Sequence, residues 1–186
     1  MIDYEALAGV CSVDGVVDVE RFAAAVADAW LGDYHGSWPD RQILEVPQGT
    51  FTYLFDATSP PGPVDTRVIG VTGRAAPPIG PRDRSRMAGY PSPQRDSPDR
   101  VDRGHLVALS MGGGYDINLV PQLASVNRRG RWRAIERYCV ARPGTFVLIH
   151  AAYNHGTDHP AWLEYGWLED GELRVELFDN QASATG

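Results

Sequence analysis

The stretch from residue 102 to residue 136 holds the side chains best suited to chemistry. The imidazole of His105 has an ordinary pKa of about 6.5, so much of it is a neutral proton acceptor at pH 7. Asn127 offers a carboxamide oxygen, which can hold Mg²⁺ without cancelling its charge. A general base beside a hydrated divalent ion is suited to hydrolysis, because the base activates water and the ion neutralises developing charge.

These residues belong to short motifs with a defined spacing. The motifs are Asp102-Arg103-Gly104-His105, Asn118-Leu119-Val120-Pro121-Gln122, and then Asn127, Trp132 and Glu136. They resemble the DNA/RNA non-specific endonucleases over about 35 residues, with a weaker likeness in strand placement over residues 50–180. The first tetrapeptide alone is a weak signal, and the combined spacing is specific. The resemblance implies a ββα-metal nuclease that hydrolyses phosphodiester bonds.

The resemblance also implies a role for each matching residue. His105 is expected to be the general base, Asn127 to hold a single Mg²⁺, and Glu136 to hold a water bound to that ion. Asn118 is expected to orient the loop or His105, and Arg103 to contact phosphate or brace its strand. Two further candidates are Arg133 and Arg137, one of which would stabilise the charged transition state, since guanidinium matches phosphate oxygens in pairs.

Structural roles remain open for several of these residues. Asn127 suits a helix N-cap, His105 could be structural, and Arg133 and Arg137 could form a solvated helix face. For Glu136 the helix geometry conflicts with the implied role. Nine residues of continuous helix turn through roughly 900°, which would point Asn127 and Glu136 to opposite sides.

A helix break at Gly130 would resolve that conflict. A break there would leave Asn127 on a short first turn and start the main helix near Arg131. In an unbroken helix, Glu136 would instead be a surface carboxylate paired with Arg133 or Arg137.

The surrounding elements predict an α+β fold, with a central antiparallel sheet, a ββα-metal motif and an N-terminal helical segment. We expect one domain over 1–186, with a helical extension at 1–40 and the nuclease core at 41–180. Within the motif, strands are expected at 106–109 and 117–120, followed by a helix over 124–142. Asp18 should cap an N-terminal helix that stops at Gly32. The other expected strands are 42–46, 50–55, 66–72, 145–153, 163–168 and 172–178.

Charge is distributed unevenly along the chain. The net charge is −7, and all 17 basic residues are arginine. Residues 67–142 carry 14 arginines against 6 acids, and the rest carries 3 arginines against 18 acids. A basic middle is typical of a polyanion-binding site, although these arginines could instead pair with the acidic ends. The Pro- and Arg-rich stretch 74–100 is either a phosphate-gripping arm or a solvated loop.

Partners and location follow from the same features. The expected substrate is DNA, with RNA as an open second substrate, cut with little sequence preference, because phosphate contacts carry no sequence information. No apolar run approaches the ~20 residues that span a bilayer, and no secretory signal is visible. We therefore expect a cytoplasmic protein or one exported without a Sec signal, acting as a toxin or defence effector under an immunity or inhibitor protein. The alternative is an inactive binding module on the same fold.

Three other patterns do not indicate a catalytic or metal site. Cys11 and Cys139 are expected to be free thiols. His150, His155 and His159 read as chance loop histidines rather than a transition-metal site. Ser110 lacks the surroundings of a nucleophile elbow.

Overall fold

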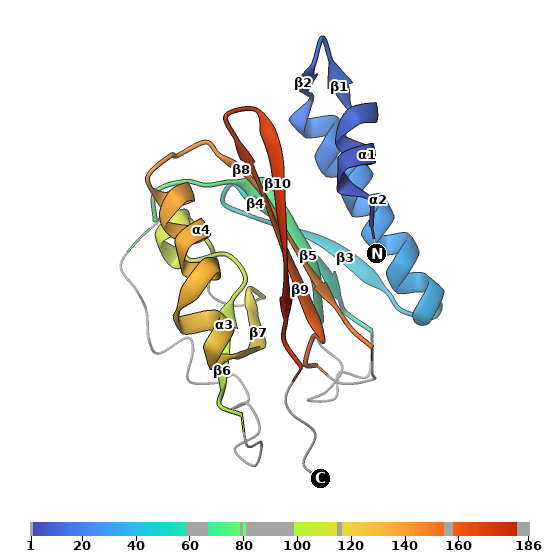
Figure 1. The fold of residues 1–186 in the computed structure, drawn as a ribbon. Coiled ribbons are helices and arrows are strands. Elements are labelled where there is room, and N and C mark those ends of the chain that lie inside the picture. The colour runs from blue at the N-terminus through green and yellow to red at the C-terminus, as the bar shows by residue number, and fades with distance from the viewer. Residues whose placement is uncertain are drawn as a thin grey trace.

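The centre of the fold is a six-stranded antiparallel sheet with the strand order β10-β9-β8-β5-β4-β3 (Figure 1). The computed structural model describes residues 2–58, 67–78, 80, 99–114, 117–154 and 158–181. The strands are β3 (Ile43–Gln48), β4 (Phe51–Asp56), β5 (Arg67–Arg74), β8 (Phe146–Ala152), β9 (Trp162–Glu169) and β10 (Glu172–Asp179). Each lies within two residues of its predicted position, and the predicted α+β class is confirmed.

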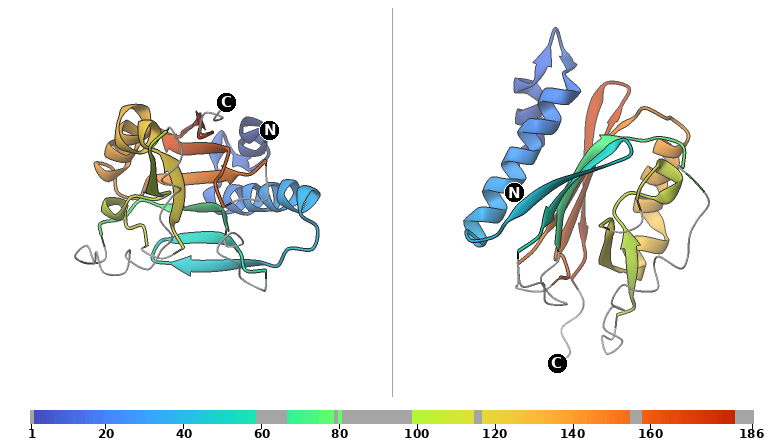
Figure 2. Two further views of the ribbon diagram at one scale, coloured as in Figure 1. Left: turned by 90° about the horizontal axis from the view of Figure 1, so that it is seen from below. Right: turned by 180° about the vertical axis from the view of Figure 1, so that it is seen from behind.

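Helices cover both faces of this sheet (Figure 2). Glu164 and Tyr165 are neighbours on β9, so their side chains point to opposite faces. Glu164 accepts a hydrogen bond from Tyr4 of α1 (Tyr4–Val10). Tyr165 packs edge-on against Trp132 of α4 (Gly130–Val140), with ring centroids 4.8 Å apart. The N-terminal helices therefore lie on one face and the ββα motif on the other.

The second N-terminal helix, α2, runs from Val19 to Ser37. Asp18 caps it as predicted, with Oδ1 accepting a first-turn backbone N–H at 3.2 Å. The predicted stop at Gly32 is wrong. Trp30 and Tyr34 are both buried and continue one apolar face past Gly32. Packing on this face outweighs the cost of about 1 kcal/mol for a glycine within a helix.

A short hairpin joins the two N-terminal helices. Its strands are β1 (Ser12–Val13) and β2 (Val16–Val17), and the two turn residues, Asp14 and Gly15, have φ of 52° and 78°. Positive φ at both positions is the geometry of a tight two-residue hairpin turn. Asp14 and Gly15 therefore form the turn of this hairpin.

Buried polar contacts tie the N-terminal helices to the sheet. Trp30 Nε1 donates to Tyr4 Oη at 2.9 Å, and Tyr4 in turn donates to Glu164. His150 Nδ1 lies 2.8 Å from the same carboxylate, and its ring stacks on Trp30. His150 is thus a buried β8 residue, which corrects its interpretation as a loop histidine. Gly70 makes room for this layer, since a Cβ there would lie 2.5 Å from the Trp30 ring.

Several other predictions can be compared with the fold. Cys11 and Cys139 are both free and buried. Among the described residues, no helix is both long and apolar enough to cross a bilayer. Most of the predicted arginine-rich arm, including Arg82, Arg84, Arg86 and Arg95, lies outside the described residues, as does His155. The organisation into one domain stays a prediction.

Candidate active site

A two-stranded hairpin carries the first two motifs. It consists of β6 (Val101–His105) and β7 (Leu119–Leu123), with His105 opposite Leu119. The first strand therefore precedes the predicted one at 106–109 and ends, rather than begins, at the histidine. A Cβ on Gly104 would lie 1.9 Å from Gln122 Oε1, so glycine is required where the Gln122 side chain crosses the hairpin.

Asn118 fixes the turn that follows His105. Its Oδ1 accepts the Val107 N–H at 2.8 Å, and its Nδ2 donates to the Val107 carbonyl at 2.7 Å and the Gly114 carbonyl at 2.8 Å. Its backbone carbonyl also accepts the Leu106 N–H at 2.9 Å. The side chain is fully buried. Asn118 thus holds the chain on both sides of the loop, and no part of its amide remains for a reactant.

The helical part of the motif is broken at Gly130. Helix α3 spans Ala124–Arg128, and α4 begins at Gly130, whose φ is +73°. Arg129 between them is extended, with φ −144° and ψ 174°. A break at this point matches the expectation from the sequence, so a continuous helix no longer fixes the direction of Glu136 relative to Asn127. Asn127 lies within α3 and is the N-cap of neither helix.

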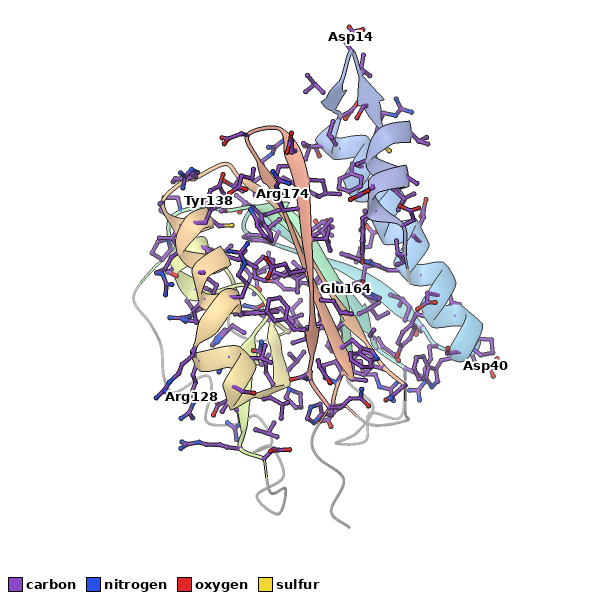
Figure 3. The ribbon with its side chains drawn as sticks, viewed as in Figure 1. Asp14, Asp40, Arg128, Tyr138, Glu164 and Arg174 are labelled. Carbon is purple, nitrogen blue, oxygen red and sulfur yellow. The ribbon has the colours of Figure 1, made fainter. Side chains whose placement is uncertain are left out.

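Asp102 joins the hairpin to α3. Asn127 Nδ2 donates to Asp102 Oδ2 at 3.1 Å, and Arg128 donates to both oxygens of the same carboxylate. Burial alone would raise the pKa of Asp102, but the hydrogen bonds from Arg128 and Asn127 outweigh it and lower that pKa below its usual value. Asp102 is therefore an anion at neutral pH. Figure 3 labels Arg128, the last residue of α3.

Glu136 occupies the buried side of α4. It is 4% exposed and accepts hydrogen bonds from Trp132 Nε1, at 3.3 Å, and from Arg133. Burial raises its pKa above the usual value, and Arg133 offsets only part of that effect. The alternative interpretation, a surface carboxylate paired with Arg133 or Arg137, is thus wrong about the exposure of Glu136. It is right about the partner, because Arg133 donates to this carboxylate.

A cleft of about 380 Å³ opens beside this carboxylate. It is lined by Ser110, Arg133, Glu136, Arg137, Val140 and Ala141. Ser110 belongs to η1 (Leu109–Met111), the turn that follows His105. Glu136 and both predicted helix arginines therefore line the same cleft as η1, the segment that follows His105.

The remaining predicted residues lie on β6. His105 and Arg103 are both half-buried, and Arg103 stands opposite Pro121. His105 ends the strand three residues after Asp102, which binds Asn127. The structure thus connects all of the predicted residues to one hairpin-helix unit, and their catalytic roles stay predictions.

Asp102 is a functional candidate that residue-by-residue reasoning from the sequence overlooked. In the sequence it is the first residue of the Asp102-Arg103-Gly104-His105 motif, and no role of its own is predicted for it. The signal in the sequence is a pairing need: a carboxamide that offers its oxygen to a cation needs an acceptor for its N–H₂ group. A carboxylate within the same motif was the obvious acceptor.

Comparison with known proteins points to one family. Residues 66–153 match the model of the family described as DNA/RNA non-specific endonuclease. A solved structure titled "extracellular endonuclease" aligns with 77% of this chain and 80% of its own, at 11% identity and a TM-score of 0.36. No curated protein matches the chain. The matched segment contains the whole hairpin, both short helices and every predicted site residue. Residues 66–153 of this chain belong to the DNA/RNA non-specific endonuclease family, whose members are nucleases.

Proposed function

We propose that this chain hydrolyses phosphodiester bonds in DNA, and also in RNA, with one Mg²⁺ and little sequence preference. One observation carries the proposal, namely the hydrogen bond from Asn127 to Asp102 inside the segment that matches the nuclease family. A carboxylate without a proton can only accept, so the amide must present its N–H₂ group to Asp102. The Asn127 carbonyl oxygen is then directed away from Asp102 and remains available as a ligand.

The residues at this site fit a hard divalent cation. Asn127 supplies a neutral oxygen, and Asp102 adds negative charge directly behind it. Mg²⁺ favours oxygen ligands and keeps several waters, so one protein ligand is an acceptable set. When bound, the ion would neutralise charge on the scissile phosphate and the leaving oxygen. The chain would hold it through Asn127, with Glu136 as the candidate for a water on the ion.

His105 is the proposed general base. Its neutral imidazole would take a proton from the attacking water. The hydrogen bonds of Asn118 to Val107 fix the backbone directly after His105, which limits movement of the ring. This bracing assigns Asn118 a positioning role. Positioning of a base within hydrogen-bond reach is needed before its pKa matters.

The arginines beside the cleft are proposed to bind phosphate. Arg133 and Arg137 both line it, next to the buried Glu136. Arg133 donates to Glu136, which holds this carboxylate while the rest of the guanidinium faces solvent. Arg137 would take the phosphate oxygens in a paired arrangement. Arg103 would contact phosphate from β6 or brace that strand.

The test is digestion of plasmid DNA and of RNA with Mg²⁺, with EDTA, and by His105→Ala and Asn127→Ala. We expect cleavage by the natural chain with Mg²⁺ and its loss in the other three cases. His35→Ala, which changes a histidine at the end of α2, is the matched control and should cleave normally. Cleavage that survives both EDTA and His105→Ala would overturn the proposal. Binding of nucleic acid without turnover by the natural chain would favour the inactive-module alternative.

Control by an immunity or inhibitor protein, as for a toxin or defence effector, extends this proposal. Its support is the proposed activity, since a nuclease with little sequence preference would harm any cell that contains it in active form. We expect expression in a bacterial host to arrest growth and His105→Ala to relieve the arrest. Normal growth with high levels of active natural protein would count against this extension.

A further inference from the structure

The strand β10 forms one edge of the central sheet, and Figure 1 looks onto this edge. All eight of its residues, from Glu172 to Asp179, pair with β9 in one unbroken register. The opposite edge, β3, contains Pro47, which cannot donate a ladder hydrogen bond. Strand edges present backbone groups to which another strand can pair. Of the two edges, β10 is the one without a proline.

The side chains of β10 leave an apolar strip on one face. Leu173, Val175 and Leu177 alternate with charged residues, so they share a face. Leu177 stands opposite Glu164, the partner of Tyr4, so this is the face that carries the N-terminal helices. Val175 and Leu177 are nevertheless 36% and 49% exposed. The N-terminal helices, although α1 contacts β10, therefore leave part of this apolar strip exposed.

The sequence of β10 is complementary to itself. When a strand pairs antiparallel with its own copy, residues of equal parity must meet, because alternate residues direct their N–H and C=O groups to the same edge. A register centred on Val175 places Arg174 opposite the partner's Glu176, twice by symmetry. It also places Leu173 opposite the partner's Leu177. Centring on residue 174 instead opposes two arginines, and centring on 176 opposes two glutamates.

We propose that β10 is the docking edge for a second copy of this chain, paired antiparallel about a two-fold axis at Val175. The two sheets then form one continuous sheet across the axis. The charged pairs can form without burying an ion, since the side chains of Arg174 and Glu176 are 50% and 28% exposed. Arg174, labelled in Figure 3, contacts Glu172 and Glu169 in its own chain. Glu176 likewise contacts Arg131.

The proposed strand pairing determines the relative orientation of the two copies. A two-fold axis through an antiparallel strand pair stands perpendicular to the sheet, so each face continues into the same face of the partner. Both N-terminal helical layers lie on one side of the joined sheet, and both ββα units lie on the other. Each cleft beside Glu136 is lined by α4, so it lies on the ββα side of the joined sheet.

Disulfide trapping tests the register directly. Val175→Cys brings two thiols face to face at the axis, within the Cα separation of about 4.4–6.8 Å that a disulfide requires. Leu177→Cys is the matched control, because it is more exposed, yet its thiol and the partner's lie four residues apart along the strands, or roughly 13 Å. We expect mild oxidation to give a covalent dimer with Val175→Cys and little with Leu177→Cys. Equal cross-linking of both variants, or none with Val175→Cys, would overturn the proposal.

Charge reversal gives a second, reversible test by sedimentation velocity. Arg174→Glu alone and Glu176→Arg alone each oppose like charges across the axis, so each should weaken the dimer by about tenfold. An equimolar mixture of the two restores opposite charges in both pairs and should form the mixed dimer. Glu45→Arg on β3 is the control and should dimerise as the natural chain does, with folding of all variants checked by circular dichroism. A natural chain that stays monomeric at about 1 mM, or a dimer indifferent to these changes, would refute the assignment.

Discussion

Asn127 and Asp102 are joined by a hydrogen bond of 3.1 Å between the carboxamide nitrogen of α3 and the carboxylate of β6. The next residue of the helix, Arg128, binds the same carboxylate through two nitrogens. One acidic side chain therefore sets both the amide orientation and the place of the short helix. Because Asn127 donates its N–H₂ group to Asp102, its side-chain carbonyl oxygen points in a fixed direction.

This relationship predicts that Asp102→Ala impairs the use of Mg²⁺. Without its acceptor, the Asn127 amide can rotate, and loss of such a supporting residue costs about 10–100-fold in metal affinity or activity. The measurement is the Mg²⁺ concentration that gives half-maximal cleavage. Arg128→Ala is the matched variant, since it removes the ion pair and keeps the bond to Asn127, and its effect should be smaller. An unchanged Mg²⁺ requirement for Asp102→Ala would contradict the positioning role.

A second prediction concerns Asn118, whose amide satisfies three backbone groups of the loop. Asn118→Ala leaves these groups without their partner, at about 1–3 kcal/mol for each one that stays buried. We expect a loss of at least about 2 kcal/mol in the free energy of unfolding, measured by urea denaturation. Asn154→Ala, at an exposed position, is the control. A stability equal to that of the control would show that the loop does not depend on this side chain.

Asn118 also explains where prediction of the hairpin failed. The apolar run 106–109 was predicted to be a strand, yet Leu106 and Val107 are fully buried in a turn. The Asn118 side chain bonds both the N–H and the C=O of Val107, as a neighbouring strand would. Burial with satisfied backbone groups therefore arises without a strand, and hydrophobicity alone cannot distinguish the two cases.

Other parts of the fold and site were within reach of the sequence. The sheet strands follow from local alternation between turn residues, and the break at Gly130 follows from the positive φ that glycine permits. The bond between His150 and Glu164 was out of reach, because it depends on the register of β8 against β9. The same holds for Asp102 and Asn127, which are brought together by the packing of α3 on the hairpin.

The buried Glu136 carboxylate predicts a pH dependence of stability. Burial raises its pKa in the folded chain above the usual 4.5, so the folded state binds the proton more tightly than the unfolded chain does. Stability due to this group is therefore lost as the pH rises from about 4.5 through the folded pKa. Glu136→Gln cannot ionise at this position and should lack that loss. As the pH rises through this window, the melting temperature of the variant should therefore increase relative to that of the natural chain. A difference that moves the other way across this window would mean a lowered pKa.

The contacts of Tyr4 predict how the N-terminal helices respond to acid. Burial raises the pKa of Glu164, but the hydrogen bonds from His150 and Tyr4 outweigh it, so the net pKa is lowered. The stabilisation from this carboxylate is therefore present above its unfolded pKa and lost as the pH falls through the folded one. Tyr4→Phe removes the hydroxyl that links Trp30 to Glu164, which should cost about 1–3 kcal/mol at pH 7.

The same variant should differ less from the natural chain in acid, since protonated Glu164 no longer offers a charged acceptor in either protein. Urea denaturation at pH 7 and at a series of lower pH values, down through the lowered pKa of Glu164, measures both differences. Tyr138→Phe is the control, because Arg142 packs over the face of the Tyr138 ring and phenylalanine retains that face. Tyr4→Phe could instead lower the free energy of unfolding by the same amount at every pH. The hydroxyl would then act only through packing and its bond to Trp30, and the charge of Glu164 would have no part in docking the N-terminal helices.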